Sequence, residues 1–166
     1  MYDELTQNDI KKIEEEIEYR KLVVRKEAIA AVKEARAHGD LSENFEYHAA
    51  KKDKNINESR IRYLERMVKT AKIVSDDSGE DEVGINKRVT LYMEDDDETE
   101  TYKLVTTVRG NSLQGRISID SPLGKAIMGK KVGERAYVAV NDSFGYYVVI
   151  QSVEDAGDDE DQIRSF

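Results

Sequence analysis

Glycine and proline are distributed so unevenly along this chain that its two parts must fold differently. Residues 1–75 contain one glycine and no proline, whereas residues 76–166 contain nine glycines and the only proline. The first part is dense in Glu, Lys, Arg, Ala, Ile and Leu, and the second is rich in the strand formers Val, Tyr, Thr and Ile. The sequence therefore predicts a helical hairpin at 1–75, a linker at 76–82, a β-rich domain at 83–154 and a disordered acidic tail at 155–166.

Apolar residues in the first part recur at the three- and four-residue spacing of a helix face. Thr6 followed by Asp9 indicates a helix start, and Gly39 can end that helix. The chain is expected to fold back near residue 42 as an antiparallel two-helix coiled coil, in which facing residue numbers sum to about 84. The predicted seam comprises Ile10, Ile13, Ile17, Val24, Ala28, Ala31 and Ala35 on the first helix, and Ala49, Ile56, Leu64, Met67, Ala71 and Val74 on the second. Such a hairpin, considered without its turn, could equally be a spacer or a dimerisation coil.

Composition excludes several function classes. The chain contains no cysteine and only two histidines, which removes disulfide scaffolds, thiol nucleophiles, cysteine zinc sites and His-rich metal sites. Its net charge of −9 makes it a poor independent binder of duplex DNA, because neutralising phosphates requires a basic surface. No apolar run approaches the roughly 18 residues that a membrane span needs, and the first residues lack a secretory pattern. We therefore expect a cytoplasmic protein.

The turn between the two predicted helices is the most informative segment, since it concentrates carboxylates. Asp40, Glu43 and Glu46 lie within seven residues, between His38 and His48. Asp40 and Glu43 are three residues apart, so both can face one way from a tight turn. Two convergent, exposed carboxylates suit Mg²⁺. Acidic residues at the start of a helix are also explained by the helix dipole, and the spacing alone leaves both explanations open.

The second part of the chain is predicted to be a small α+β domain. Ser121 can cap a short helix that runs to Met128, with Pro122 at its first position. The β-rich segments lie at 83–93, 99–108, 115–119, 136–140 and 146–153.

Two segments resemble signatures of the bacterial Gre family of transcript cleavage factors. The first is the run EARAHGDLSENFEYHAAKKDKNINESRIRYLERMVKTAKIV, and the second is ISIDSPLGKAIMGKKVGE. The order of hairpin, linker and β-rich domain is also that of the family, so the resemblance covers roughly residues 5–154. It implies an α+β fold class, with an N-terminal antiparallel two-helix coiled-coil hairpin and a C-terminal FKBP-like domain.

The resemblance implies an accessory elongation factor and not a complete enzyme. Gre factors bind RNA polymerase beside its secondary channel and extend the hairpin tip to the catalytic centre, where the polymerase cleaves the RNA 3′ end extruded by backtracking. Asp40 and Glu43 match the two tip acids, which help to hold a second, weakly bound Mg²⁺ and to position water. The implied cofactor is thus Mg²⁺ held jointly with the polymerase, with none expected in the isolated protein.

The same resemblance assigns further residues by their positions in the two signatures. The implied partners are RNA polymerase and the nascent RNA 3′ end, with no independent sequence-specific DNA binding and no membrane, and the chain is expected to be a monomer. Turn packing, helix capping or a solvated helix face could equally explain several of these residues. They are Leu41, Asn44 and Tyr47 for tip shape, Lys51 and Lys52 for RNA contact, and Asp120, Ser121 and Pro122 for polymerase binding.

Three departures from the family pattern keep a second function open. Phe45 stands where the family usually has a small alanine, Arg20 replaces an apolar seam residue, and the segment Asn141–Gly145 lacks the usual proline. A Gre-like regulator that docks in the channel without stimulating cleavage is therefore the alternative. A structural adaptor unrelated to polymerase is a third hypothesis, which predicts that Asp40 and Glu43 are dispensable.

Overall fold

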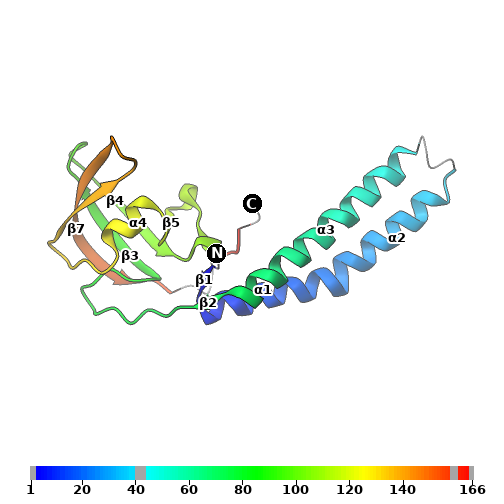
Figure 1. Cartoon of the computed structure of the whole chain (residues 1–166), viewed down its shortest axis with the longest axis horizontal. Helices are drawn as coiled ribbons and strands as arrows, with labels where there is room; N and C mark the ends of the chain where they lie inside the picture. The colour runs from blue at the N-terminus through cyan, green and yellow to red at the C-terminus, as the bar shows by residue number, and fades with distance from the viewer. Residues whose placement is uncertain (1–2, 40–43, 158–160, 165–166) are drawn as a thin grey trace. The chain divides into compact units, whose positions relative to one another are not determined.

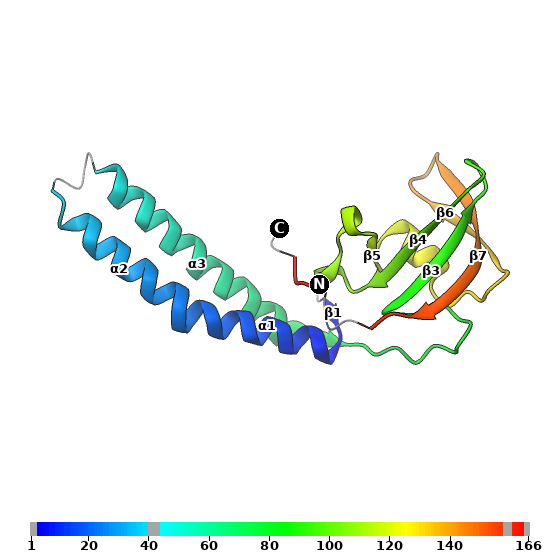
Figure 2. The same cartoon turned by 180° about the vertical axis from the view of Figure 1, so that it is seen from behind.

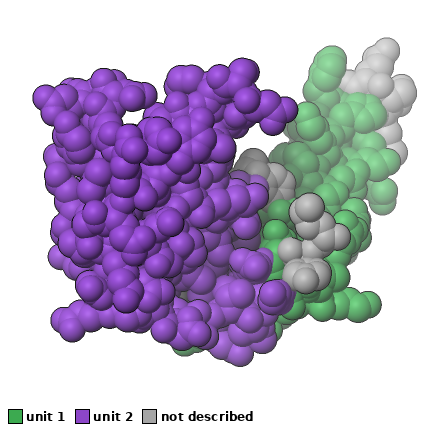
Figure 3. All heavy atoms as spheres, turned by 60° about the vertical axis from the view of Figure 1, so that its left-hand side comes forward, with its two compact units in different colours: residues 1–3, 10–71 green, residues 4–9, 72–166 purple. Residues whose placement is uncertain are grey.

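The computed structural model describes residues 3–39, 44–157 and 161–164. The chain divides into two compact units (Figure 3), the first formed by residues 1–3 and 10–71 and the second by residues 4–9 and 72–166. The predicted α+β fold class is confirmed, since the first unit is a helical hairpin and the second contains a mixed sheet.

The hairpin consists of two helical arms that run side by side in both views (Figures 1 and 2). The first arm comprises α1 (Gln7–Tyr19), a π-helical turn η1 (Arg20–Val24) and α2 (Arg25–Arg36). The second arm is a single helix, α3 (Phe45–Thr70). Short π-helical segments within α-helices shift the phase of the residues on either side. The helix faces before and after η1 therefore do not follow one uninterrupted 3.6-residue period.

Three of the thirteen predicted seam residues, Ala31, Ala49 and Ile56, are exposed. Ile13, Leu64 and Met67 are buried as expected, but Ala49 is exposed and the Ile56 side chain is 56% exposed. The face of α3 that turns inward instead includes Ile61 and two polar residues, Asn57 and Arg60.

Hydrogen bonds to the first arm explain this change of face. The Arg20 guanidinium donates to Asn57 Oδ1 at 3.1 Å, whereas Arg20 was expected to face Leu64. Arg60 Nε donates to Glu16 Oε2 at 3.0 Å, and Arg25 pairs with Glu58 through Nη2 and Oε1 at 2.8 Å. Because buried polar groups must be hydrogen-bonded, these pairs fix Asn57 and Arg60 against the first arm and leave Ile56 outside.

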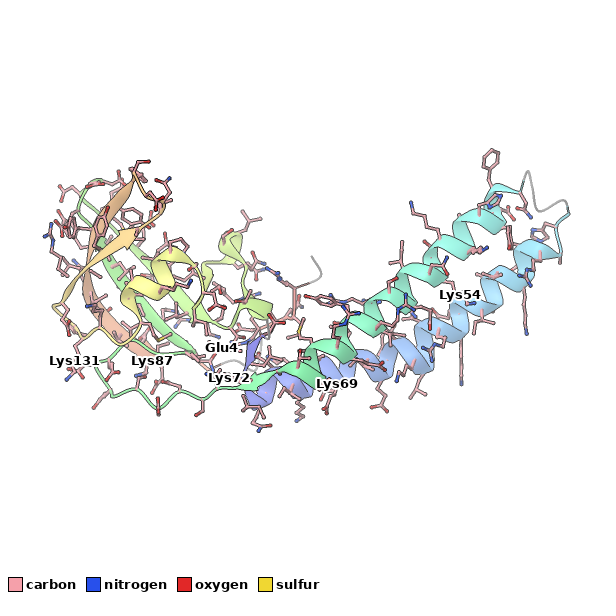
Figure 4. All side chains as sticks on the ribbon, in the orientation of Figure 1. Glu4, Lys54, Lys69, Lys72, Lys87 and Lys131 are labelled. Atoms are coloured by element: carbon pink, nitrogen blue, oxygen red, sulfur yellow. The ribbon has the colours of Figure 1, made fainter. Side chains whose placement is uncertain are left out.

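Two short strands join the segments on either side of the hairpin. β1 (Glu4–Leu5) pairs in parallel with β2 (Lys72–Ile73), and Figure 4 shows the register partners Glu4 and Lys72 next to each other. Val74 N–H also donates to the Leu5 carbonyl at 2.9 Å. Val74, predicted as the last seam residue of the second arm, follows β2 and packs against the core of the second unit.

The predicted helix start at Thr6 is confirmed. Thr6 N–H donates to Asp9 Oδ2 at 2.9 Å, and Asp9 N–H donates to Thr6 Oγ1 at 3.1 Å. These two bonds satisfy backbone donors at the beginning of α1 reciprocally, which is the capping-box arrangement.

The second unit is built on a five-stranded sheet. Its strand order is β5 (Arg116–Ser118), β4 (Glu98–Val105), β3 (Lys87–Met93), β7 (Gly145–Asp155) and β6 (Arg135–Ala139), in which only the β4–β5 pair is parallel. The helix α4 (Pro122–Ile127) contributes Leu123 and Ile127 to the core under the sheet. The other buried apolar residues of this core are Val83, Ile85, Val89, Leu91, Leu104, Ile119, Ala136, Val138, Val148 and Ile150.

The segments predicted as linker and disordered tail both contact the second unit. Lys87, labelled in Figure 4, donates its ammonium to the backbone carbonyls of Gly79 and Glu82 within the linker. In the tail, the Asp161 side chain is 9% exposed, and Arg164 N–H donates to the Val108 carbonyl at 2.8 Å. The described part of the tail is thus anchored by specific polar contacts that its acidic composition does not reveal.

Leu64→Ala should lower the free energy of unfolding of the hairpin by about 2–5 kcal/mol, because Leu64 is fully buried and its truncation leaves a cavity. Ile56→Ala is the matched control and should cost less than about 1 kcal/mol, since over half of that side chain is in water. Urea unfolding followed by circular dichroism measures both. Equal losses would contradict the observed seam.

Candidate functional site

The two predicted acids of the hairpin tip, Asp40 and Glu43, lie outside the described residues, as do Leu41 and Ser42. The residues on both sides of this gap are described. Gly39 has a φ of +128°, a backbone conformation that glycine adopts without strain. The first arm therefore ends at a residue suited to a sharp change of direction.

Asn44 connects the two arms at the tip. Its side-chain oxygen accepts from Tyr47 N–H at 3.0 Å and caps α3, while its amide nitrogen donates to the Ala35 carbonyl at 2.6 Å. One side chain thus satisfies a backbone donor at the start of the second arm and a backbone acceptor near the end of the first. Asn44 therefore ties the end of the first arm to the start of the second.

Tyr47 is buried just below the tip between two cations. Its ring lies 5.6 Å from Arg36 Cζ and 6.0 Å from Lys51 Nζ. A hydrogen bond from Arg36 and the positive charge of Lys51 lower the pKa of the Tyr47 hydroxyl, against an opposing effect of burial. The structure therefore brings predicted tip residue Tyr47 together with predicted RNA-contacting residue Lys51.

Several other described side chains at the tip are exposed. Phe45, the first residue of α3, is 88% exposed, and His38 Nδ1 lies 2.9 Å from Glu46 Oε2. Lys52 is exposed on the same helix, and Figure 4 places Lys54 farther along it. Exposed cations therefore lie on the helix that begins at the tip.

The second predicted site, at Asp120, Ser121 and Pro122, lies where β5 leads into α4. Ser121 Oγ accepts from Gly124 N–H at 3.0 Å and donates to the Ser118 carbonyl at 2.6 Å, so its role in capping the helix is confirmed. Pro122 is the first helical residue, as predicted. A Cβ at Gly124 would collide with the Ser118 carbonyl, which explains the need for glycine there.

Asp120 is exposed, yet a closed ring of hydrogen bonds orients it. Thr107 Oγ1 donates to Asp120 Oδ2 at 2.9 Å, and Asp120 N–H donates to Ser118 Oγ at 3.0 Å. Ser118 Oγ and Thr107 Oγ1 lie 2.6 Å apart. Because the single proton of Thr107 goes to the carboxylate, the Ser118 hydroxyl must donate to Thr107. Sequence reasoning missed Thr107, which is thirteen residues from Asp120 and carries no pattern that links them.

In residues 3–39, 44–157 and 161–164, no group of three or more His, Cys, Asp or Glu residues is arranged to hold a metal ion. Within the same ranges, no helix has the length and apolar character to cross a membrane.

The sequence matches two family profiles that together span most of the chain. The profile described as "Transcription elongation factor, N-terminal" matches residues 4–73, and the one described as "Transcription elongation factor, GreA/GreB, C-term" matches residues 77–155. The boundary between them coincides with the end of β2.

Curated relatives and solved structures carry related names. Transcription elongation factor GreA of Bacillus subtilis is 42% identical over 134 residues, which cover 81% of this chain and 85% of the relative. GreA of Caldanaerobacter subterraneus is 44% identical over 137 residues, covering 82% and 87%. A structure titled "Structure of the transcription factor Gfh1." matches with 24% identity, coverage of 92% and 97%, and a TM-score of 0.45. With both profiles matched and identity above 40% over most of each curated relative, the chain belongs to the GreA/GreB family of transcription elongation factors.

Proposed function

We propose that this chain binds RNA polymerase at its secondary channel and stimulates the polymerase to cleave backtracked nascent RNA. Family membership identifies it as a transcription elongation factor that acts with RNA polymerase. The observation that carries the finer proposal is the tip, where Asn44 joins the two helical arms around a segment with two carboxylates. A rigid support of this kind reduces the entropy lost when the carboxylates are positioned for chemistry.

Asp40 and Glu43 are the residues proposed to hold Mg²⁺, jointly with the polymerase. Their fit rests on the chemistry of the donors, because hard carboxylate oxygens with few protein ligands and free positions for phosphate and water are what Mg²⁺ prefers. When bound, the ion supplies charge stabilisation at the RNA phosphate. The chain contributes the two carboxylates, and Asn44 and Tyr47 shape the turn that presents them. The factor is therefore an accessory to the polymerase's own nuclease.

The lysines below the tip are proposed to contact the extruded RNA. Lys51 is placed beside the Tyr47 ring, and Lys52 is exposed next to it. Ammonium groups interact with backbone phosphates whatever the base, which suits a factor that must act on many transcripts. This contact complements the tip acids, since like charges would otherwise repel the RNA.

Docking on the polymerase is assigned to Asp120, Ser121 and Pro122. The hydrogen-bond ring through Thr107 and Ser118 holds the Asp120 carboxylate in one orientation while leaving it exposed. A carboxylate fixed before binding loses less rotamer entropy when it meets a partner's cation.

The cleavage proposal is tested on a stalled, backtracked elongation complex with Mg²⁺. The wild-type chain should shorten the RNA from its 3′ end. Asp40→Asn and Glu43→Gln should bind polymerase normally yet lose at least about tenfold in cleavage rate, since even outer-shell partners of metal ligands contribute roughly 10- to 100-fold. Asp53→Asn, which removes an exposed carboxylate from α3, is the matched control and should retain full activity.

Other outcomes separate the alternatives. A wild-type chain that binds but leaves the RNA intact would identify a docking regulator in place of a cleavage factor. Full cleavage by the Asp40→Asn and Glu43→Gln double variant would refute the assignment of the tip acids.

Thr107→Val should weaken polymerase binding about three- to tenfold, because it removes one hydrogen bond that orients Asp120. Asp120→Ala should weaken binding further, and both variants should cleave normally when the factor saturates the polymerase. Thr99→Val, an exposed substitution in β4, is the control and should change neither property. Fluorescence anisotropy with labelled factor gives the dissociation constants. Equal binding by Thr107→Val and wild type would contradict the positioning role.

A further inference from the structure

Phe45 is an aromatic side chain that the fold leaves in water at the start of the second arm. It is the first residue of α3, and at 88% it has the largest exposed fraction of any aromatic residue in the described part of the chain. Within that part, no other ring and no cation packs on it, whereas the Tyr47 ring lies close to Arg36 and Lys51. An apolar ring of this size releases binding free energy when a partner covers it.

Asn44 fixes the backbone from which the Phe45 ring projects. Its side-chain oxygen accepts from Tyr47 N–H at 3.0 Å, and its amide donates to the Ala35 carbonyl at 2.6 Å. Phe45 therefore belongs to a helix start that is tied to both arms. A side chain on an ordered backbone loses less entropy on binding than one on a disordered loop does.

Phe45 shares one face of α3 with a small residue and a cation. Residues separated by four and by seven positions lie on the same side of a helix. From Phe45 these positions are Ala49 and Lys52, and all three residues are exposed. The face therefore carries an aromatic ring at its end and an ammonium group whose backbone lies about 10 Å farther from the tip, since each helical residue adds roughly 1.5 Å.

The residues around the ring favour a nucleic-acid base over a protein surface as its partner. An aromatic anchor in a protein interface is normally surrounded by contacts that exclude water. Glu46 and His48, which follow Phe45 along the helix, are polar and exposed, and Glu46 Oε2 lies 2.9 Å from His38 Nδ1. Stacking on a base requires one open aromatic face, and a nearby cation adds a contact to the phosphate backbone. Phe45 and Lys52 supply these two groups.

We propose that the Phe45 ring stacks on an unpaired base of the extruded RNA, and that Lys52 contacts a backbone phosphate of the same strand. This inference rests on the proposed function, because backtracked RNA must reach the tip before the ring can meet it. Every base has an aromatic face, so the contact accepts any sequence. Unpaired bases reach the tip only where RNA has been extruded, so stacking makes binding specific for backtracked complexes.

The stacking is tested by fluorescence anisotropy with labelled factor on two elongation complexes, one backtracked and one not, in EDTA to keep the RNA intact. Phe45→Leu should weaken binding to the backtracked complex at least about fivefold, since stacking contributes roughly 5- to 150-fold per base. It should leave binding to the other complex unchanged. Phe45→Tyr keeps the ring and should match the wild type on both. Phe144→Leu, which removes another exposed ring, is the control and should not distinguish the two complexes.

Two results of this comparison would overturn the RNA contact. The first is binding of Phe45→Leu to the backtracked complex as tightly as the wild type binds. The second is an equal loss of affinity on both complexes, because that loss would assign the ring to the protein wall of the polymerase channel.

The phosphate contact has a separate readout in the salt dependence of binding. Neutralising one phosphate of a single strand contributes about 0.7 to the slope of log K against log salt concentration. Lys52→Gln should reduce the slope by about this amount on the backtracked complex alone. Lys69→Gln, at the opposite end of α3 (Figure 4), is the matched control and should preserve the slope. Equal slopes for Lys52→Gln and the wild type would refute the phosphate contact.

A spectroscopic signal separates the stacking from the cleavage proposal. 2-Aminopurine in the extruded RNA loses fluorescence when it stacks on another ring, and the measurement in EDTA requires no cleavage. The wild type and Phe45→Tyr should quench this fluorescence at saturation, and Phe45→Leu should not. If the wild type quenches the signal but leaves the RNA intact in Mg²⁺, the cleavage proposal fails and the stacking stands. If it cleaves the RNA without quenching, the stacking is refuted and the cleavage proposal stands.

Discussion

A two-helix hairpin has a single seam to hold its arms together, and in this chain the middle of that seam is polar. Glu16 accepts from both Arg20 and Arg60, and Asn57 bonds to Arg20 across the arms. Burial acts to raise the pKa of Glu16, yet the two arginines lower it overall, so the carboxylate stays charged. Partly buried ion pairs of this kind add little net stability, but they penalise any register in which one partner is left alone. The register of the arms fixes which residues meet at the tip.

The tip depends on this register through Asn44. Its two hydrogen bonds, to Tyr47 and to Ala35, form only if the ends of α2 and α3 are level with each other. A slip by one residue would break one of them and rotate the helix face that carries Tyr47 and Lys51. The polar seam and the Asn44 hydrogen bonds thus act together, since the seam sets the phase of the two arms and Asn44 joins their ends.

Much of this architecture could be predicted from the sequence, because local chemistry determines it. Thr6 with Asp9, and Ser121 with Pro122, form the helix starts that their residue types favour. The seam was less predictable. Its prediction assumed that apolar residues face inward, which failed at Ile56 because hydrogen bonding of Asn57 decides the face of α3. The π-helical turn at Arg20–Val24 likewise has no signature in composition.

The residues of the proposed functional sites likewise include some that the sequence predicts and some that only the structure reveals. The assignments of Asp40 and Glu43 remain predictions, since they rest on the family signature and both residues lie outside the described ranges. Thr107 could not be found from the sequence, because it acts on a partner that is distant along the chain. The acidic composition of the tail predicted disorder. The buried Asp161 carboxylate nevertheless pairs with Lys103 and Arg109, and these specific ion pairs anchor this part of the tail despite its average charge.

Because β1 pairs with β2, the chain leaves and re-enters the second unit at neighbouring points, and the helical hairpin is an insertion between them. An insertion whose ends are held together can be lengthened or shortened without disturbing the host fold, provided that both arms change by the same number of turns. Each added turn extends an arm by roughly 5.4 Å. The length of the hairpin is therefore an adjustable dimension, separable in evolution or in engineering from the fold of the second unit.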